Sequence, residues 1–81
     1  MDTRIALIGI IVEDKVDITT VNNTLSEYSD YVVGRMGVPY RQKDLYVISV
    51  IVDAQLDVIN ALSGKLGKIK GTSVKTVCTK K

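Results

Sequence analysis

The sequence predicts an α+β fold, and three observations support this prediction. Two runs, residues 4–12 and 45–53, are almost entirely apolar and rich in β-branched side chains, which is typical of central strands. Two other segments, residues 15–29 and 53–66, repeat apolar residues every three or four positions, as amphipathic helices do. With two further strands the order becomes βαββαβ. This order indicates a ferredoxin-like arrangement, in which a four-stranded antiparallel sheet carries two helices on one face.

The first strand is expected from Arg4 to Val12, in the run RIALIGIIV. Successive side chains of a strand point to opposite faces, yet both sets are apolar here. A single layer of helices covers only one face of a sheet. We therefore expect the second face to meet another subunit, in a homo-oligomer that is a dimer or a tetramer.

The first helix is expected between Lys15 and Ser29. Its apolar stripe consists of Ile18, Val21, Leu25 and Tyr28, and polar residues fall between them. Asp14 or Asp17 can serve as the N-cap, because a carboxylate there accepts hydrogen bonds from free backbone N–H groups.

The next two strands, residues 31–40 and 45–53, are joined by the polar segment 41–44, which has the length of a hairpin loop. In the usual strand order 4-1-3-2, the strand 31–40 lies at an edge. Pro39 suits an edge because it cannot donate to a ladder. Gly34 and Gly37 permit a bulge or a close backbone approach there.

The second helix is expected from Asp53 to Leu66, with Gly67 as its C-terminal stop. The last strand, residues 72–79, alternates polar and less polar side chains more weakly. No linker or low-complexity tract divides the 81 residues, so they form one domain. Because so small a domain buries limited surface, association with other subunits would stabilise it.

Charge is distributed unevenly along the chain, although the net charge is only +2. All nine acidic residues lie at or before Asp57, and the remainder is purely basic. A basic patch can attract phosphates. However, this part of the chain has no arginine for bidentate contacts and no aromatic residue for base stacking. The two central strands offer only Tyr46 as an aromatic, so direct binding of nucleic acid is disfavoured.

Few residues could support catalysis or bind a metal. The chain has no histidine, and Cys78 is its single cysteine, so we predict no catalytic residue, no metal site and no disulfide. Asp14 and Asp17 could form an acid/base pair, but helix capping explains them better. The residues do not identify any cofactor, so the cofactor is left unknown. It has neither a signal peptide nor an apolar run of about 18 residues, so we expect a cytoplasmic protein.

One stretch, GRMGVPYR, combines glycines, arginines and an aromatic ring. Its pattern resembles the GxxG loop of KH domains only poorly, because that loop joins two helices. We favour packing of an edge strand, and keep a ligand site for a carboxylate or phosphate as the alternative. Tyr31 lies nearby, and the candidate ligand-binding residues are Gly34, Arg35, Met36, Gly37, Tyr40 and Arg41.

Four segments together resemble a known family across nearly the whole chain. They are RIALIGIIVED, YVVGRMGVPYRQKDLYVISVIVDA, DVINALSGKLGKIKG and SVKT. The sequence is similar to the small regulators of the iron-only (FeFe) hydrogenase system of anaerobic bacteria. This resemblance implies a ferredoxin-like fold, grouped with ACT-like domains and with the ligand-sensing half of nickel-responsive repressors.

The resemblance implies a non-enzymatic regulatory module that binds a small ligand or a partner. The nickel-sensing relatives bind metal through histidines and a cysteine, so the absence of histidine excludes nickel sensing by that site. They also carry a separate DNA-binding domain, for which 81 residues leave no room. The alternative function is an accessory factor or enzyme in hydrogenase cofactor maturation.

Overall fold

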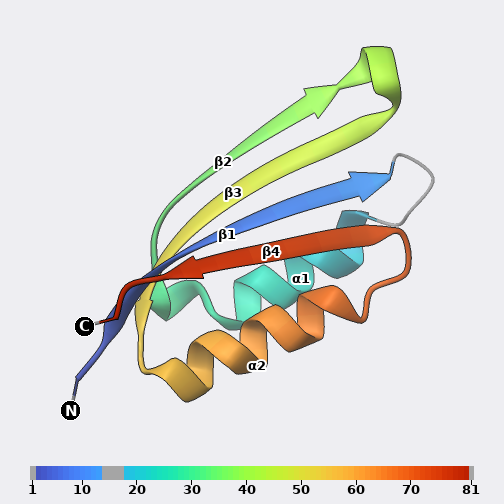
Figure 1. The fold of residues 1–81 in the computed structure, drawn as a ribbon. Helices are drawn as coiled ribbons and strands as arrows, with labels where there is room; N and C mark the ends of the chain where they lie inside the picture. The colour runs from blue at the N-terminus through green and yellow to red at the C-terminus, as the bar shows by residue number, and fades with distance from the viewer. Residues whose placement is uncertain (1, 14–17, 81) are drawn as a thin grey trace.

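The computed structural model describes residues 2–13 and 18–80. In this part of the chain it has four strands and two α-helices in the order βαββαβ (Figure 1). Their bounds are β1 (Arg4–Glu13), α1 (Ile18–Glu27), β2 (Val32–Tyr40), β3 (Leu45–Ala54), α2 (Leu56–Gly67) and β4 (Thr72–Cys78). Two short 3-10 turns, η1 (Ser29–Tyr31) and η2 (Arg41–Lys43), flank β2.

The strands form one antiparallel sheet in the order β2-β3-β1-β4. This confirms the predicted ferredoxin-like topology, in which the two strands that are apolar on both faces are central. Figure 1 shows both helices on the same side of the sheet, so the molecule has two layers. The opposite side of the sheet carries no helix in the described residues.

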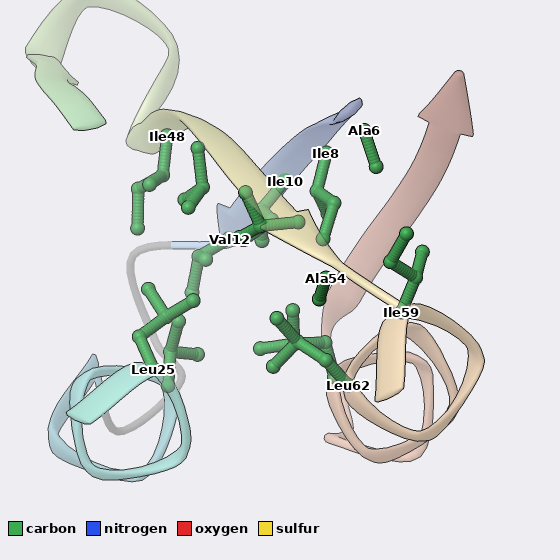
Figure 2. Close-up of a cluster of buried hydrophobic side chains, with 13 residues drawn as sticks. Ala6, Ile8, Ile10, Val12, Leu25, Ile48, Ala54, Ile59 and Leu62 are labelled. Atoms are coloured by element: carbon green, nitrogen blue, oxygen red, sulfur yellow. The ribbon is translucent and has the colours of Figure 1, made fainter. Parts of the chain in front are cut away.

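The hydrophobic core lies between the sheet and the two helices (Figure 2). It takes one face of β1 and β3 and one stripe of each helix, and every member is aliphatic. The core residues are Ala6, Ile8, Ile10, Val12, Val21, Leu25, Ile48, Val50, Val52, Ala54, Ile59, Leu62 and Leu66. Aliphatic side chains of this size fill the space without a Phe or Trp, as the composition predicts.

The boundary between α1 and β2 differs from the expectation. The helix ends at Glu27, and Tyr31 belongs to η1 and not to the strand. The Tyr31 N–H donates to the Tyr28 carbonyl oxygen at 3.0 Å, which closes a tight turn, and the two rings lie 6.3 Å apart between centroids. The expected helix start at Lys15 and the N-caps Asp14 and Asp17 lie outside the described residues.

The boundary between β3 and α2 also differs, by about one turn of helix. Asp53 was expected both to end the strand and to start the helix; it lies in β3 and pairs with Ile5 of β1. The helix begins only at Leu56, after Gln55, whose carbonyl oxygen accepts the first helical hydrogen bonds. Pairing with the neighbouring central strand therefore outweighs the local helical spacing of this segment.

Candidate functional site

β2 lies at an edge of the sheet, and a β-bulge interrupts its pairing with β3. Val32 pairs with Val52, whereas Gly34 pairs with Ile51, so Val33 is the extra residue. Val52 is buried in the core, and Ile51 is on the opposite face. After the bulge the even-numbered residues of β2 therefore lie on the face without helices, and the odd-numbered ones lie on the helix side.

This register divides the six candidate ligand-binding residues between two faces. Gly34, Met36 and Tyr40 lie on the face without helices, where the Met36 side chain is 64% exposed. Arg35 and Gly37 lie on the helix side. Arg41 follows the strand, in η2. The six residues are neighbours in sequence, but the structure does not bring them together at one point.

The glycines of β2 lie in ordinary extended strand. Neither Gly34 nor Gly37 has a positive φ, and a Cβ built at either position would meet nothing within 4 Å. The GxxG segment lies in a strand, as predicted, and not in a loop between helices. The bulge beside Gly34 agrees with the expectation for this edge. No close backbone approach within the described chain requires these glycines.

Arg35 contacts α1. Its Nη2 atom donates a hydrogen bond to Asn22 Oδ1 at 3.0 Å. Beside this contact is a groove of about 310 Å³ between α1, η1 and the helix side of β2 and β3. Its lining residues are Asn22, Leu25, Ser26, Ser29, Val32, Arg35 and Val50.

Arg35 was among the predicted site residues, whereas the polar residues opposite it were not. Asn22, Ser26 and Ser29 are spaced at i, i+4 and i+7, so they form a polar stripe along one side of α1 and its extension. That spacing is visible in the sequence. It indicates that the three residues share one side of the helix. Only the fold shows that Arg35 faces them.

The sheet face without helices, called the open face below, is largely apolar. Its large apolar side chains come from all four strands and are between 40% and 69% exposed. They are Ile5, Leu7, Ile11, Met36, Val38, Tyr40, Val47, Ile51 and Val77. So many exposed apolar side chains on one face are typical of an interaction site. The prediction that β1 and β3 are apolar on both faces is confirmed.

A shallow depression lies near the middle of the open face. Gly9 of β1 pairs with Ser49 on one side and Lys75 on the other, so small or flexible residues surround it. The depression has a volume of about 280 Å³, and Ile11, Val47 and Ser73 also line it. It can receive a side chain or a small apolar group from outside the chain.

The charged residues of the open face lie at its two ends and along one edge strand, where Lys75 also borders the depression at Gly9. By register, Glu13 lies at one end of the face, Asp53 lies at the other, and Lys75 lies on the edge strand β4. An apolar centre with a polar rim is the common arrangement of a protein–protein interface.

A separate polar cluster joins the two helices. Lys65 Nζ lies 3.2 Å from Glu27 Oε2 and 5.2 Å from the centre of the Tyr28 ring. Hydrogen bonding to the Tyr28 side chain, and then to the Glu27 carboxylate, raises the pKa of Lys65 above its ordinary value. The side chains of Lys65 and Glu27 are more than half exposed, so this cluster is a weak surface contact between the helices.

Residues 2–13 and 18–80 contain no group of three His, Cys, Asp or Glu side chains that could hold a metal ion. No described helix is both long and apolar enough to cross a membrane. Cys78 is half-buried on the helix side of β4, and Tyr46 packs against the core. Tyr46 is therefore not available for stacking on the open face.

The fold and this surface define a small ferredoxin-like α+β domain with one uncovered apolar sheet face. The chain belongs to the TM1266-like family, whose model matches residues 4–76 and is described as "Iron-only hydrogenase system regulator, putative". The match confirms the family resemblance predicted from the sequence.

Two solved structures are similar to this chain. TM1266 from Thermotoga maritima is 38% identical with a TM-score of 0.93, and the match covers 98% of this chain and all of that one. LarC2, the C-terminal domain of a cyclometallase involved in the synthesis of the NPN cofactor of lactate racemase, is 11% identical with a TM-score of 0.52. That match covers 94% of this chain and 56% of LarC2, and it shows a shared fold alone. No protein of curated function matches.

Proposed function

We propose that this chain is a regulatory module of the iron-only hydrogenase system that works as a homo-oligomer and binds a small ligand or a partner. Its family description supports the hydrogenase system as the setting. The observation that carries the oligomer is the open face, where nine large apolar side chains remain 40% to 69% exposed. Covering this surface would remove a large apolar area from water.

A second copy of the chain is the partner we propose for the open face. A two-fold interface needs a surface that complements itself. The rim offers this, because Lys75 of one copy can meet Glu13 or Asp53 of the other around the apolar centre. A small domain with a thin two-layer core also gains most from such association.

Sedimentation velocity and native mass spectrometry test this proposal with a matched pair of variants. Leu7→Lys places a charge in the open face, where Leu7 is 45% exposed. Leu56→Lys makes the same change at a leucine that is 41% exposed at the start of α2, away from that face. We expect wild type and Leu56→Lys to be oligomeric, and Leu7→Lys to be monomeric and folded.

A monomeric wild type, or equal assembly of the two lysine variants, would exclude the open face as the oligomer interface.

The regulatory role that we propose is tested separately, in the source organism. Hydrogenase transcript and activity are compared after deletion of the gene and after complementation with wild type, Leu7→Lys or Leu56→Lys. We expect only Leu7→Lys to fail in complementation. Unchanged hydrogenase levels in the deletion strain would contradict a regulatory role.

A further inference from the structure

We infer that the groove between α1 and β2 binds a small organic carboxylate with a short aliphatic body. The inference rests on the proposed function, since it names the chemical class of the small ligand. Arg35 supplies the positive charge, α1 and η1 supply polar groups, and core side chains supply an apolar floor.

The bulge at Val33 is the first observation that supports this site. Without the extra residue, the alternation that starts from Val32 would place residue 35 on the open face. With it, Arg35 pairs with Val50 and lies on the helix side, where its guanidinium reaches Asn22. Bulges that re-aim a side chain in this way are common next to functional sites.

The remaining hydrogen-bonding capacity of Arg35 is the second observation. One Nη atom is hydrogen-bonded to Asn22 Oδ1, and no carboxylate of residues 2–13 or 18–80 forms an ion pair with Arg35. The guanidinium has further N–H donors in a planar fork that matches a carboxylate. Asn22 orients this fork without neutralising its charge.

The lining of the groove determines the rest of the ligand. The hydroxyl groups of Ser26 and Ser29 can donate to an anion, while Leu25, Val32 and Val50 offer an apolar floor. The volume of about 310 Å³ lies at the small end of ligand sites, which span roughly 300–1,000 Å³. A carboxylate that carries a few carbon atoms fits this combination of size and chemistry.

The groove favours a carboxylate over a phosphate. Phosphate sites usually combine several cations or a helix N-terminus. Among the described residues, Arg35 is the only basic residue of the lining. Ser26 lies in the last turn of α1 and Ser29 follows in η1, so both are near the C-terminal end of the helix, where free carbonyl groups repel negative charge. A singly charged ligand held mainly by Arg35 meets less of this repulsion than a dianion.

Titration of ¹⁵N-labelled protein with 3-methylbutanoate, followed by NMR, tests the site. The neutral 3-methylbutanamide and inorganic phosphate are the comparison probes. We expect 3-methylbutanoate to shift the amide signals of Asn22, Ser26, Ser29 and Val32, and to bind more tightly than either comparison probe. Arg35→Gln should weaken binding about tenfold or more. Arg35→Lys should recover part of the affinity, because lysine restores charge without the fork.

Lys43→Gln is the matched control, because it removes one positive charge from η2, outside the groove. We expect its affinity to change less than about twofold. Equal binding by wild type and Arg35→Gln, tighter binding of phosphate, or no shift of the groove signals would overturn the inference.

Sedimentation of the same samples separates this inference from the proposed function. If the protein is oligomeric but 3-methylbutanoate does not bind at the groove, the carboxylate site is wrong and the oligomer proposal stands. If the groove binds the probe in a monomeric wild type, the oligomer proposal is wrong and the carboxylate site stands.

Discussion

Gly9 lies in the middle of β1, between Ser49 of β3 and Lys75 of β4. A Cβ built at Gly9 would meet the Lys75 carbonyl oxygen at 3.8 Å, which is an ordinary van der Waals contact. The fold therefore does not require glycine here, although glycine weakens the interior of a strand. The proposed approach of a second copy to the open face gives a reason for glycine at this position, because a side chain here would point into the interface.

We expect Gly9→Ala to leave the fold intact and to weaken association. The free energy of unfolding of the dissociated chain should rise by about 0.4–1 kcal/mol, because alanine restricts the unfolded state. Urea unfolding at low protein concentration measures the stability, and sedimentation measures the association. Gly64→Ala is the control, because a Cβ on this exposed helical residue meets nothing within 4 Å. It should stabilise α2 by about 0.5–1 kcal/mol and leave association unchanged.

If Gly9→Ala lowers the stability of the dissociated chain, a Cβ at Gly9 is not accommodated by the space beside the Lys75 carbonyl oxygen. If it associates as well as wild type does, the depression at Gly9 is not part of the interface.

The candidate site around Arg35 was only partly predictable from the sequence. Arg35 was recognisable as a candidate binding residue by its chemistry and its glycine neighbours. Its partner Asn22 is 13 residues away, and the bulge at Val33 determines which face Arg35 occupies. The glycines indicated that a bulge is possible, but neither its position at Val33 nor the partner of Arg35 follows from local sequence, because both depend on how β2 pairs with β3.

In the connection from α2 to β4, the residue whose conformation requires glycine is Gly71 and not the predicted Gly67. Gly67 was expected as the helix stop, and it is the last residue of α2. The left-handed conformation occurs later, at Gly71, with φ of 79°. The Gly71 carbonyl oxygen accepts a hydrogen bond from the Glu13 N–H at 3.0 Å, which ties this turn to the end of β1.

We expect Gly71→Ala to lower the free energy of unfolding by about 1 kcal/mol or more, because a Cβ disfavours the left-handed conformation. Gly67→Ala should instead raise it by up to about 1 kcal/mol, since Gly67 is helical and its Cβ position is open. Urea unfolding of both variants measures the difference. Equal effects of the two substitutions would contradict the assignment of the turn to Gly71.

The contact of Lys65 with Glu27 and Tyr28 should make stability depend on pH in the alkaline range. The Tyr28 side chain and the Glu27 carboxylate raise the pKa of Lys65 in the folded protein above the ordinary value of 10.5. The folded state therefore holds this proton more tightly than the unfolded state does. The stabilisation is fully present below pH 10.5 and is lost as the pH rises through the folded pKa.

Urea unfolding from about pH 9 to about pH 12 should show a small loss of stability in wild type that Lys65→Gln lacks. Lys68→Gln removes the same charge just beyond the end of α2 and should follow wild type. The effect is small because Lys65 and Glu27 are more than half exposed. The same alkaline slope in Lys65→Gln would show that other groups cause it.

The sequence predicts which strands and helices exist better than it predicts where they end. The apolar runs of β1 and β3 and the helical spacing of α1 and α2 each follow from local periodicity. The end of β3 does not, because Asp53 fits the start of a helix and is held in the strand by its pairing with Ile5. Strand order was accessible because the βαββαβ topology has a usual order, 4-1-3-2, which places the two doubly apolar strands at the centre.

The whole molecule is elongated, with principal extents of 42 × 18 × 18 Å. Figure 1 shows that the β2–β3 hairpin extends beyond the helix layer. The helices therefore cover one side of a long sheet incompletely and the other side not at all. Such a shape buries less apolar surface within one chain than a compact body of the same length would.

If two copies cover each other's open faces, thermal stability must depend on protein concentration. Association binds the folded state and not the unfolded one, so mass action favours folding as concentration rises. For a dimer of this size we expect Tm to rise by about 3 °C for each tenfold increase in concentration. Circular dichroism over a wide concentration range measures this slope. Leu56→Lys should keep the slope, and Leu7→Lys should lose it, because only Leu7 lies on the open face. A wild-type Tm that is constant across the range would show that folding is independent of association, and the open face would then need another occupant.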